Sequence, residues 1–133
     1  MTAVNRRVKQ MSELRDAGRG PAGAPHDVTN LSSAAAELLD QARGSNAGRA
    51  ARTLIPGGGA PLKQTLLALV AGQSLAEHDP PAAAALQVLA GRVRLVSGGE
   101  ELYLGAGDHA PIPPVRHHLD CVDDAVVLLT VTQ

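Results

Sequence analysis

The sequence predicts an all-β barrel preceded by one short helix, and two observations support this fold class. From residue 50 onward, short apolar runs alternate with turns rich in Gly and Pro, such as residues 56–59 and 97–100. About eight or nine such runs follow one another at the spacing of roughly 8–12 residues that is typical of β-sandwiches and barrels. Aromatic residues are almost absent, with Tyr103 but no Phe or Trp, so Leu, Val, Ile and Ala must fill the core.

Residues 1–28 are expected to form a disordered N-terminal tail, with at most a helical turn near residues 5–16. Residues 1–20 hold five Arg or Lys against two acidic residues, a net charge of +3, whereas the whole chain carries −1. A solvated tail is expected, and a weak nucleic-acid-binding arm is the alternative, although no aromatic residue is interleaved with these charges. The translation start is either Met1 or Met11.

Residues 29–133 are expected to contain one helix and a single barrel. Asn30 is a suitable N-cap, and Gly44 is the expected C-cap. The apolar residues between them follow at spacings of four, three and four, which places them on one helical face: Leu31, Ala35, Leu38 and Ala42. We expect this face to pack on the outside of the barrel or on a second subunit.

The strands of the barrel are expected at residues 51–55, 63–70, 74–78, 86–89, 91–96, 101–104, 109–113, 118–122 and 125–132. Residues 97–100 are expected to form a hairpin turn, and residues 123–124 another one between the last two strands. Residues 79–81 (Asp-Pro-Pro) should end the third strand, because proline cannot donate a hydrogen bond to a sheet.

Composition excludes several classes of protein. The single Cys121 excludes an internal disulfide and a Cys-rich zinc motif. No apolar run is long enough for a transmembrane helix, and the N-terminus lacks the apolar core of a signal peptide, so the expected location is cytoplasmic, with no membrane partner. The shortage of aromatic side chains argues against oligonucleotide binding and against a carbohydrate platform, so no specific nucleic-acid partner is expected.

Two motifs with regular spacing lie between residues 50 and 132. The first contains Gly72, His78 and Gly91, and the second contains Gly107, Pro113 and His118. Their order and spacing resemble those of the RmlC-like cupin superfamily, in particular small single-domain bacterial cupins of unassigned biochemistry. The resemblance implies a cupin barrel, that is, a double-stranded β-helix or jelly roll, with one short N-terminal helix.

The resemblance also implies where a metal would bind. In metal-binding cupins, two histidines and a glutamate of the first motif and a histidine of the second hold a divalent metal. His78 and His118 match two of these positions, but Pro80 and Ala84 replace the other two, and Val115 replaces a glycine of the second motif. Since catalytic zinc normally has three protein ligands, we expect no metal cofactor. The alternative is Zn, Fe, Mn or Ni bound with a third ligand, for which the candidates are Glu77, His109, His117 and Asp120.

Five polar residues are expected to line the lumen and bind a ligand: His78, His118, Gln64, Gln87 and Asp120. His118 is expected to point inward and His117 outward, because neighbouring residues on a strand face opposite sides. Asp120 has the parity of His118 and can orient its imidazole. Gln64 and Gln87 interrupt apolar strands. For Gln87, the alternation of side chains along the strand also allows an exposed position. His109 is expected at the surface.

The function predicted from these observations is a small-molecule-binding or interaction barrel without a complete metal site, for a ligand that the sequence leaves unknown. One alternative is a metal-dependent enzyme, isomerase or dioxygenase-like, that uses His78 and His118 with a non-standard third ligand. Another is a regulator, which ranks last because no helix-turn-helix pattern is present. A homodimer is expected from the habit of the family and because edge strands need covering. No catalytic residue is assigned.

Overall fold

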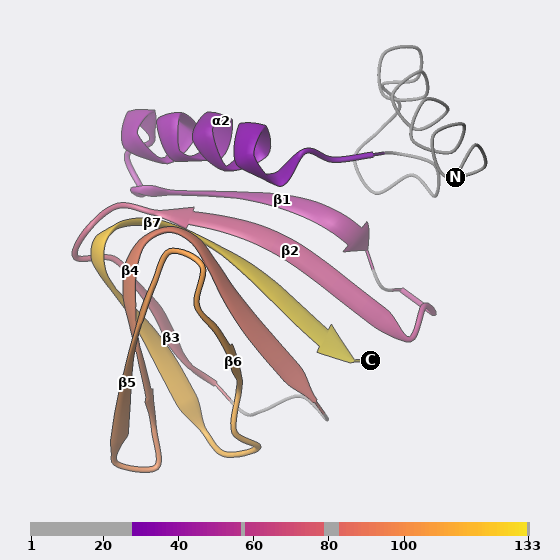
Figure 1. Ribbon diagram of the computed structural model, residues 1–133, viewed down its shortest axis with the longest axis vertical. Coiled ribbons are helices and arrows are strands. Elements are labelled where there is room, and N and C mark those ends of the chain that lie inside the picture. Colours follow the sequence, from indigo (N-terminus) through magenta and orange to yellow (C-terminus); the bar gives the residue numbers. More distant parts are fainter. Residues whose placement is uncertain (1–27, 57, 79–82, 133) are drawn as a thin grey trace, which may run out of the picture.

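The computed structural model describes residues 28–56, 58–78 and 83–132. The expected tail and the choice between Met1 and Met11 therefore fall outside the described residues. The elements, in chain order, are α2 (Leu31–Gly44), β1 (Arg49–Pro56), β2 (Leu62–Leu69), β3 (Ser74–His78), β4 (Ala84–Ser97), β5 (Glu100–Gly105), β6 (His109–Pro111) and β7 (His117–Thr132). The predicted fold class, an all-β barrel preceded by a short helix, is confirmed, and in the described residues this helix is α2 (Figure 1).

Two long strands, β4 and β7, hold the barrel together. The sheet follows the order β1-β2-β7-β4-β5, with β3 added to β7 and β6 added to β4. The second half of β7 pairs with β2, and its first half pairs with β3. β4 pairs with β7 along both halves, so these two strands pass from one side of the barrel to the other (Figure 1).

The predicted hairpin at residues 123–124 is wrong, because β7 runs through these residues without reversing. The two separate strands expected at residues 86–89 and 91–96 are likewise one strand, β4. The β4–β7 register shifts several times between Val88 and Val93, and Gly91 has a positive φ of 76°. These irregularities let the paired strands bend together, so two acidic residues that favour a turn locally remain within β7. The hairpin turn between β4 and β5 lies at residues 97–100, as predicted.

Helix α2 begins as predicted. The backbone N–H of Ser33 donates to Oδ1 of Asn30 at 2.9 Å, which satisfies one of the free amides of the first turn. The C-cap differs from the expectation: Gly44 is the last helical residue, and Ser45 caps the helix in an extended conformation by donating to the carbonyl of Ala42. The helix packs along the outside of β1 and β2, which is one of the two partners considered for it (Figure 1).

The side chains of β2 alternate between two apolar cores. Leu67 and Leu69 contact the core inside the barrel, whereas Leu66 and Ala68 contact the core under α2. Full burial of a leucine stabilises the fold by about 1.5–3 kcal/mol, so both faces of this strand contribute. In the described part of the chain, no helix has both the length and the hydropathy to span a membrane.

Candidate functional site

The lumen of the barrel contains a small, apolar cavity of about 30 Å³. Eight aliphatic side chains and one histidine line it: Leu67, Leu75, Leu86, Leu95, Ile112, His117, Leu119, Val127 and Leu129. A water molecule needs roughly 10–15 Å³ of such space, so the cavity has room for about two water molecules. Pockets that enclose a whole organic ligand usually measure about 300–1,000 Å³.

His117 is the polar side chain of this lining, and it is buried at 5% relative exposure. Its Nδ1 lies 2.9 Å from the carbonyl oxygen of Val115, two residues earlier. A carbonyl oxygen only accepts, so Nδ1 carries the hydrogen, and in the neutral ring Nε2 is then an acceptor. The short segment before β7 thus fixes both the orientation and the tautomer of the imidazole.

The expectation that His118 points inward and His117 outward is wrong, and the two are exchanged. The burial of β7 alternates from its first residue, with His117 buried and His118 half-buried. Adjacent residues do face opposite sides, as expected, but the phase is opposite to the one that the motif suggested. A signal was available in the sequence, because the apolar Leu119 and Cys121 share the parity of His117.

Asp120 lies with His118 on the outer face of the sheet and not in the lumen. Its carboxylate accepts from Oγ of Ser74 at 2.8 Å and from Nε of Arg94 at 3.1 Å, and Nε2 of His118 is 3.4 Å away. The hydrogen bond from Arg94 is the main reason why the pKa of Asp120 is below its ordinary value. The carboxylate that accepts from Ser74 is also held by Arg94 and has a lowered pKa, so it is a poor general base for activating the Ser74 hydroxyl. The cluster therefore ties β3, β4 and β7 together.

The two glutamines expected in the lumen both lie outside it. Gln64 has the parity of Leu66, which packs under α2, and its amide donates to Oγ1 of Thr130 at 3.1 Å. Gln87 is flanked on β4 by two residues of the inner core, so it belongs to the outer face. Gln87 thus faces away from the lumen, as in the alternative considered for it, although its side chain is half-buried and not exposed. Apolar strands with a single polar residue do not reveal which face that residue occupies.

The backbone of His78 lies directly opposite His117 in the β3–β7 ladder. The side chains of Glu77 and His78, and all of Pro80, lie outside the described residues. Among the residues described, no group of three His, Cys, Asp or Glu side chains could hold a metal. His109 is exposed on β6, as expected. His117 is the one described residue of the lumen lining whose side chain can ligate a metal, so the described residues do not form a metal site. Whether the protein binds a metal stays a prediction.

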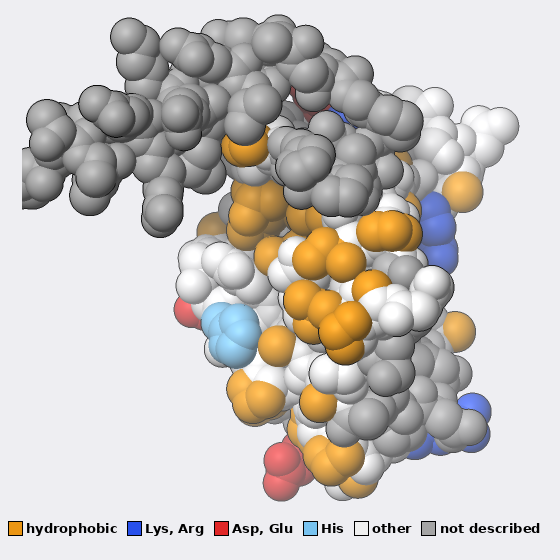
Figure 2. Space-filling view, turned by 90° about the vertical axis from the view of Figure 1, so that its right-hand side faces the viewer, with side chains coloured by type: hydrophobic (Ala, Val, Ile, Leu, Met, Phe, Trp, Pro, Cys, Tyr) orange, Lys and Arg blue, Asp and Glu red, His pale blue; other side chains and the backbone are white. Residues whose placement is uncertain are grey.

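One end of the barrel has an apolar surface. Figure 2 shows hydrophobic side chains gathered on the side of the molecule where β1 and β7 end and where β2 and β4 begin. The partly buried apolar residues at these strand ends include Ile55, Leu62, Ala84 and Val131. An apolar ligand or partner that approaches this end would meet a surface of matching character.

No protein-family model and no curated protein matches this chain. Solved structures do match. A conserved protein of unknown function from Streptococcus pyogenes is 24% identical with a TM-score of 0.61, over 67% of this chain and 77% of that protein. A cupin 2 conserved barrel domain protein from Salinispora arenicola is 24% identical with a TM-score of 0.56, over 68% of this chain and 83% of that one.

A third similar structure belongs to an enzyme. The DMSP lyase of Ruegeria pomeroyi is 26% identical with a TM-score of 0.54 over 64% of this chain, which spans 47% of that protein. A protein of unknown function and a lyase are thus both similar to this chain in fold. Likeness at this level of identity establishes the fold, while activity must be argued from the site.

Proposed function

Because this chain has the cupin fold, we propose that it is a small-molecule-binding barrel, with the lumen around His117 as its binding site. The observation that carries the proposal is the lining of the lumen, eight aliphatic side chains and one imidazole. Such a lining favours an apolar ligand that carries a single polar group, because each further buried polar group without a partner costs about 1–3 kcal/mol.

The geometry of His117 supports a particular polar group on the ligand. With Nδ1 held by the carbonyl of Val115, Nε2 of the neutral ring is an acceptor, which a ligand can engage by exchanging with a contact that the ring makes inside the protein. A hydroxyl or an amide N–H would donate to it. The ligand class that fits is therefore an aliphatic alcohol or amide, with its polar group at the end that enters the lumen.

The size of the cavity limits how much of the ligand enters. A volume of about 30 Å³ accommodates only the polar end and an adjoining carbon or two. The rest of the molecule would extend along the apolar strand ends of Figure 2. A ligand with an aliphatic chain and a polar head meets both conditions.

The test is a titration with short aliphatic alcohols and amides. Binding is monitored through the methyl NMR signals of Leu67, Ile112 and Leu129. We expect saturable shifts, and about tenfold weaker binding in His117→Leu, the equivalent of about 1.4 kcal/mol for a lost hydrogen bond. His118→Leu, on the outer face, is the matched control and should bind like the parent. If no lumen methyl shifts saturably, or if both variants weaken binding equally, the proposal is wrong.

A second candidate, a metal-dependent enzyme, is favoured by one observation: the ladder places His78 opposite His117. In that case His117, and not His118, would be the second histidine of the site. Elemental analysis of native protein distinguishes the two candidates. About one equivalent of transition metal per chain that is lost in His117→Leu and kept in His118→Leu would support the enzyme and displace the binding proposal.

A further inference from the structure

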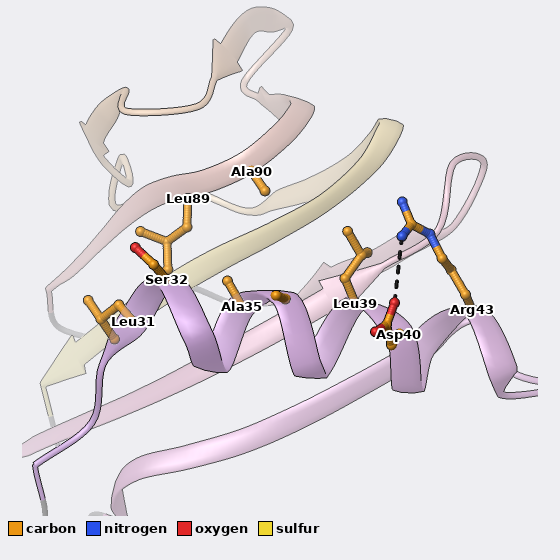
Figure 3. Close-up of a pocket in the computed structure, with 9 residues that line it drawn as sticks. Leu31, Ser32, Ala35, Leu39, Asp40, Arg43, Leu89 and Ala90 are labelled. Carbon is orange, nitrogen blue, oxygen red and sulfur yellow. Dashed lines mark ion pairs between the residues drawn. The ribbon is translucent and has the colours of Figure 1, made fainter. Parts of the chain in front are cut away.

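A second hollow lies outside the barrel, between α2 and β4 (Figure 3). It is an open groove of about 420 Å³. Seven of its residues come from the helix and two from the strand: Leu31, Ser32, Ala35, Ala36, Leu39, Asp40, Arg43, Leu89 and Ala90. Its interior is mainly apolar, and an ion pair between Asp40 and Arg43, at 3.9 Å, lies at one end.

The groove exists because α2 is seated towards one edge of the sheet. Its most buried residues, among them Leu38 and Ala42, contact the core above β2, while the helix makes less contact with β4. On the β4 side the helix carries small residues such as Ala36, which is exposed, and Leu89 of the strand is only partly buried. An elongated apolar surface therefore remains beside the helix, with the volume of an ordinary binding site.

We propose that this groove binds residues 4–14 of the same chain as an amphipathic helix. Residues 1–27 lie outside the described part of the chain, so their sequence supplies the evidence for this occupant. Its apolar residues recur at spacings of four, three and three, which places them along one face of a helix: Val4, Val8, Met11 and Leu14. Helix-in-groove binding uses this pattern of anchors.

The dimensions of the two parts agree. At about 1.5 Å per residue, residues 4–14 would span about 15 Å as a helix, and the groove follows α2 from Leu31 to Arg43 over about 18 Å. The 13 residues from 15 to 27, which join the segment to the described part of the chain, reach about 43 Å when extended, which is ample to bring the segment alongside α2. Tethering at the start of α2 also gives the segment a high effective concentration at the groove.

Charge favours the same occupant. Residues 1–20 carry a net charge of +3, and because the whole chain carries −1, the remainder carries −4. The helix that forms the groove carries Glu37 and Asp40 against Arg43, and Asp40 exposes 83% of its side chain. The basic residues of the segment, such as Arg6 and Arg7, are thus attracted towards this acidic body.

The test uses the full chain and a tryptophan reporter, since the natural sequence contains no Trp. Met11→Trp places the reporter on the apolar face of the segment, and Glu13→Trp places it on the opposite, polar face as the matched control. We expect blue-shifted emission from Met11→Trp only. Adding Ala36→Glu, which brings a charge into the groove, should abolish the shift, whereas Gln41→Glu, exposed on α2 outside the groove lining, should leave it unchanged.

Any of the following three results would overturn the proposal. Equal emission from the two reporters would mean that the segment does not bind by its apolar face. A shift that survives Ala36→Glu in a folded protein would place the segment elsewhere. A shift that disappears on dilution would mean that the groove of a second copy receives it. The comparison of the two reporters needs no groove variant, so it remains decisive if Ala36→Glu fails to fold.

Discussion

Replacing Gly91 by alanine should be among the most damaging single changes in this protein. Gly91 has a φ of 76°, and a Cβ built there would lie 2.0 Å from the carbonyl oxygen of Asp124 and 2.7 Å from Cα of Ala125. Both neighbours are backbone atoms, so they cannot rotate away. The bend at which β4 and β7 cross the barrel together would have to open.

The size of the effect follows from two parts. The left-handed conformation costs an alanine about 1–2 kcal/mol. Moving the β7 backbone away from the new methyl group disturbs the ladder on both sides of the bend, so we expect a total loss above about 4 kcal/mol, which is exceptional for one substitution. Since a domain of this size has a stability of about 5–15 kcal/mol, Gly91→Ala should fold marginally or not at all.

Gly72→Ala is the matched control. Gly72 has a φ of 89°, but a Cβ there would meet nothing within 4 Å, so only the conformational cost applies. The effect of alanine on the unfolded chain is the same in both variants and cancels in the comparison. Urea denaturation followed by far-UV circular dichroism measures both losses. If Gly91→Ala and Gly72→Ala lose equal stability, the close approach of β7 at Gly91 does not restrict the strand, and the explanation of the bend is wrong.

Three further variants or treatments test other contacts. Asp120→Asn should lower the urea midpoint at neutral pH, because the pKa of Asp120 is lowered in the folded protein, mainly by the hydrogen bond from Arg94. This stabilisation is present above the ordinary value of 3.8 and is lost as the pH falls through the folded value, so parent and variant should converge in acid; a constant difference would contradict the assignment. Burial raises the pKa of Cys121 from 9.0 to about 11, which leaves about a hundredfold less thiolate near pH 8. A thiol reagent should therefore label it slowly in the native protein and quickly in urea, and rapid native labelling would show that the residue is accessible. Asn30→Ala should cost about 1 kcal/mol through loss of the bond to Ser33, against no loss in the exposed control Gln41→Ala.

Several local features of this protein could be read from the sequence because they depend on neighbours along the chain. The cap at Asn30 and the apolar face of α2 require only residues within one or two helical turns. The hairpin at residues 97–100 is set by adjacent glycines with positive φ. The fold class also followed, because the periodic strands and the two motifs with regular spacing leave few architectures for a chain with a single aromatic residue.

The long bent strands were beyond the reach of such local patterns. Asp123 and Asp124 favour a turn by composition, yet they remain in β7. Oδ1 of Asp124 accepts from the backbone N–H of Ala71, and its Oδ2 accepts from Nε of Arg43, both at 2.8 Å. These partners are 53 and 81 residues away in the chain. Contacts at such separation decide against the local preference.

The candidate site shows the same division most clearly. The sequence by itself determined that His117 and His118 face opposite sides of a strand, because successive side chains alternate. The tertiary structure decided which of them enters the lumen, in the phase that the parity of the apolar Leu119 and Cys121 indicates. Alternation has two possible phases, and the choice depends on how β7 pairs with β3 and β4 and on which face can bury Leu119 and Cys121. A shift of one residue exchanges the two faces completely, so the residue that lines the binding site is fixed by pairing and burial and not by its position in a motif.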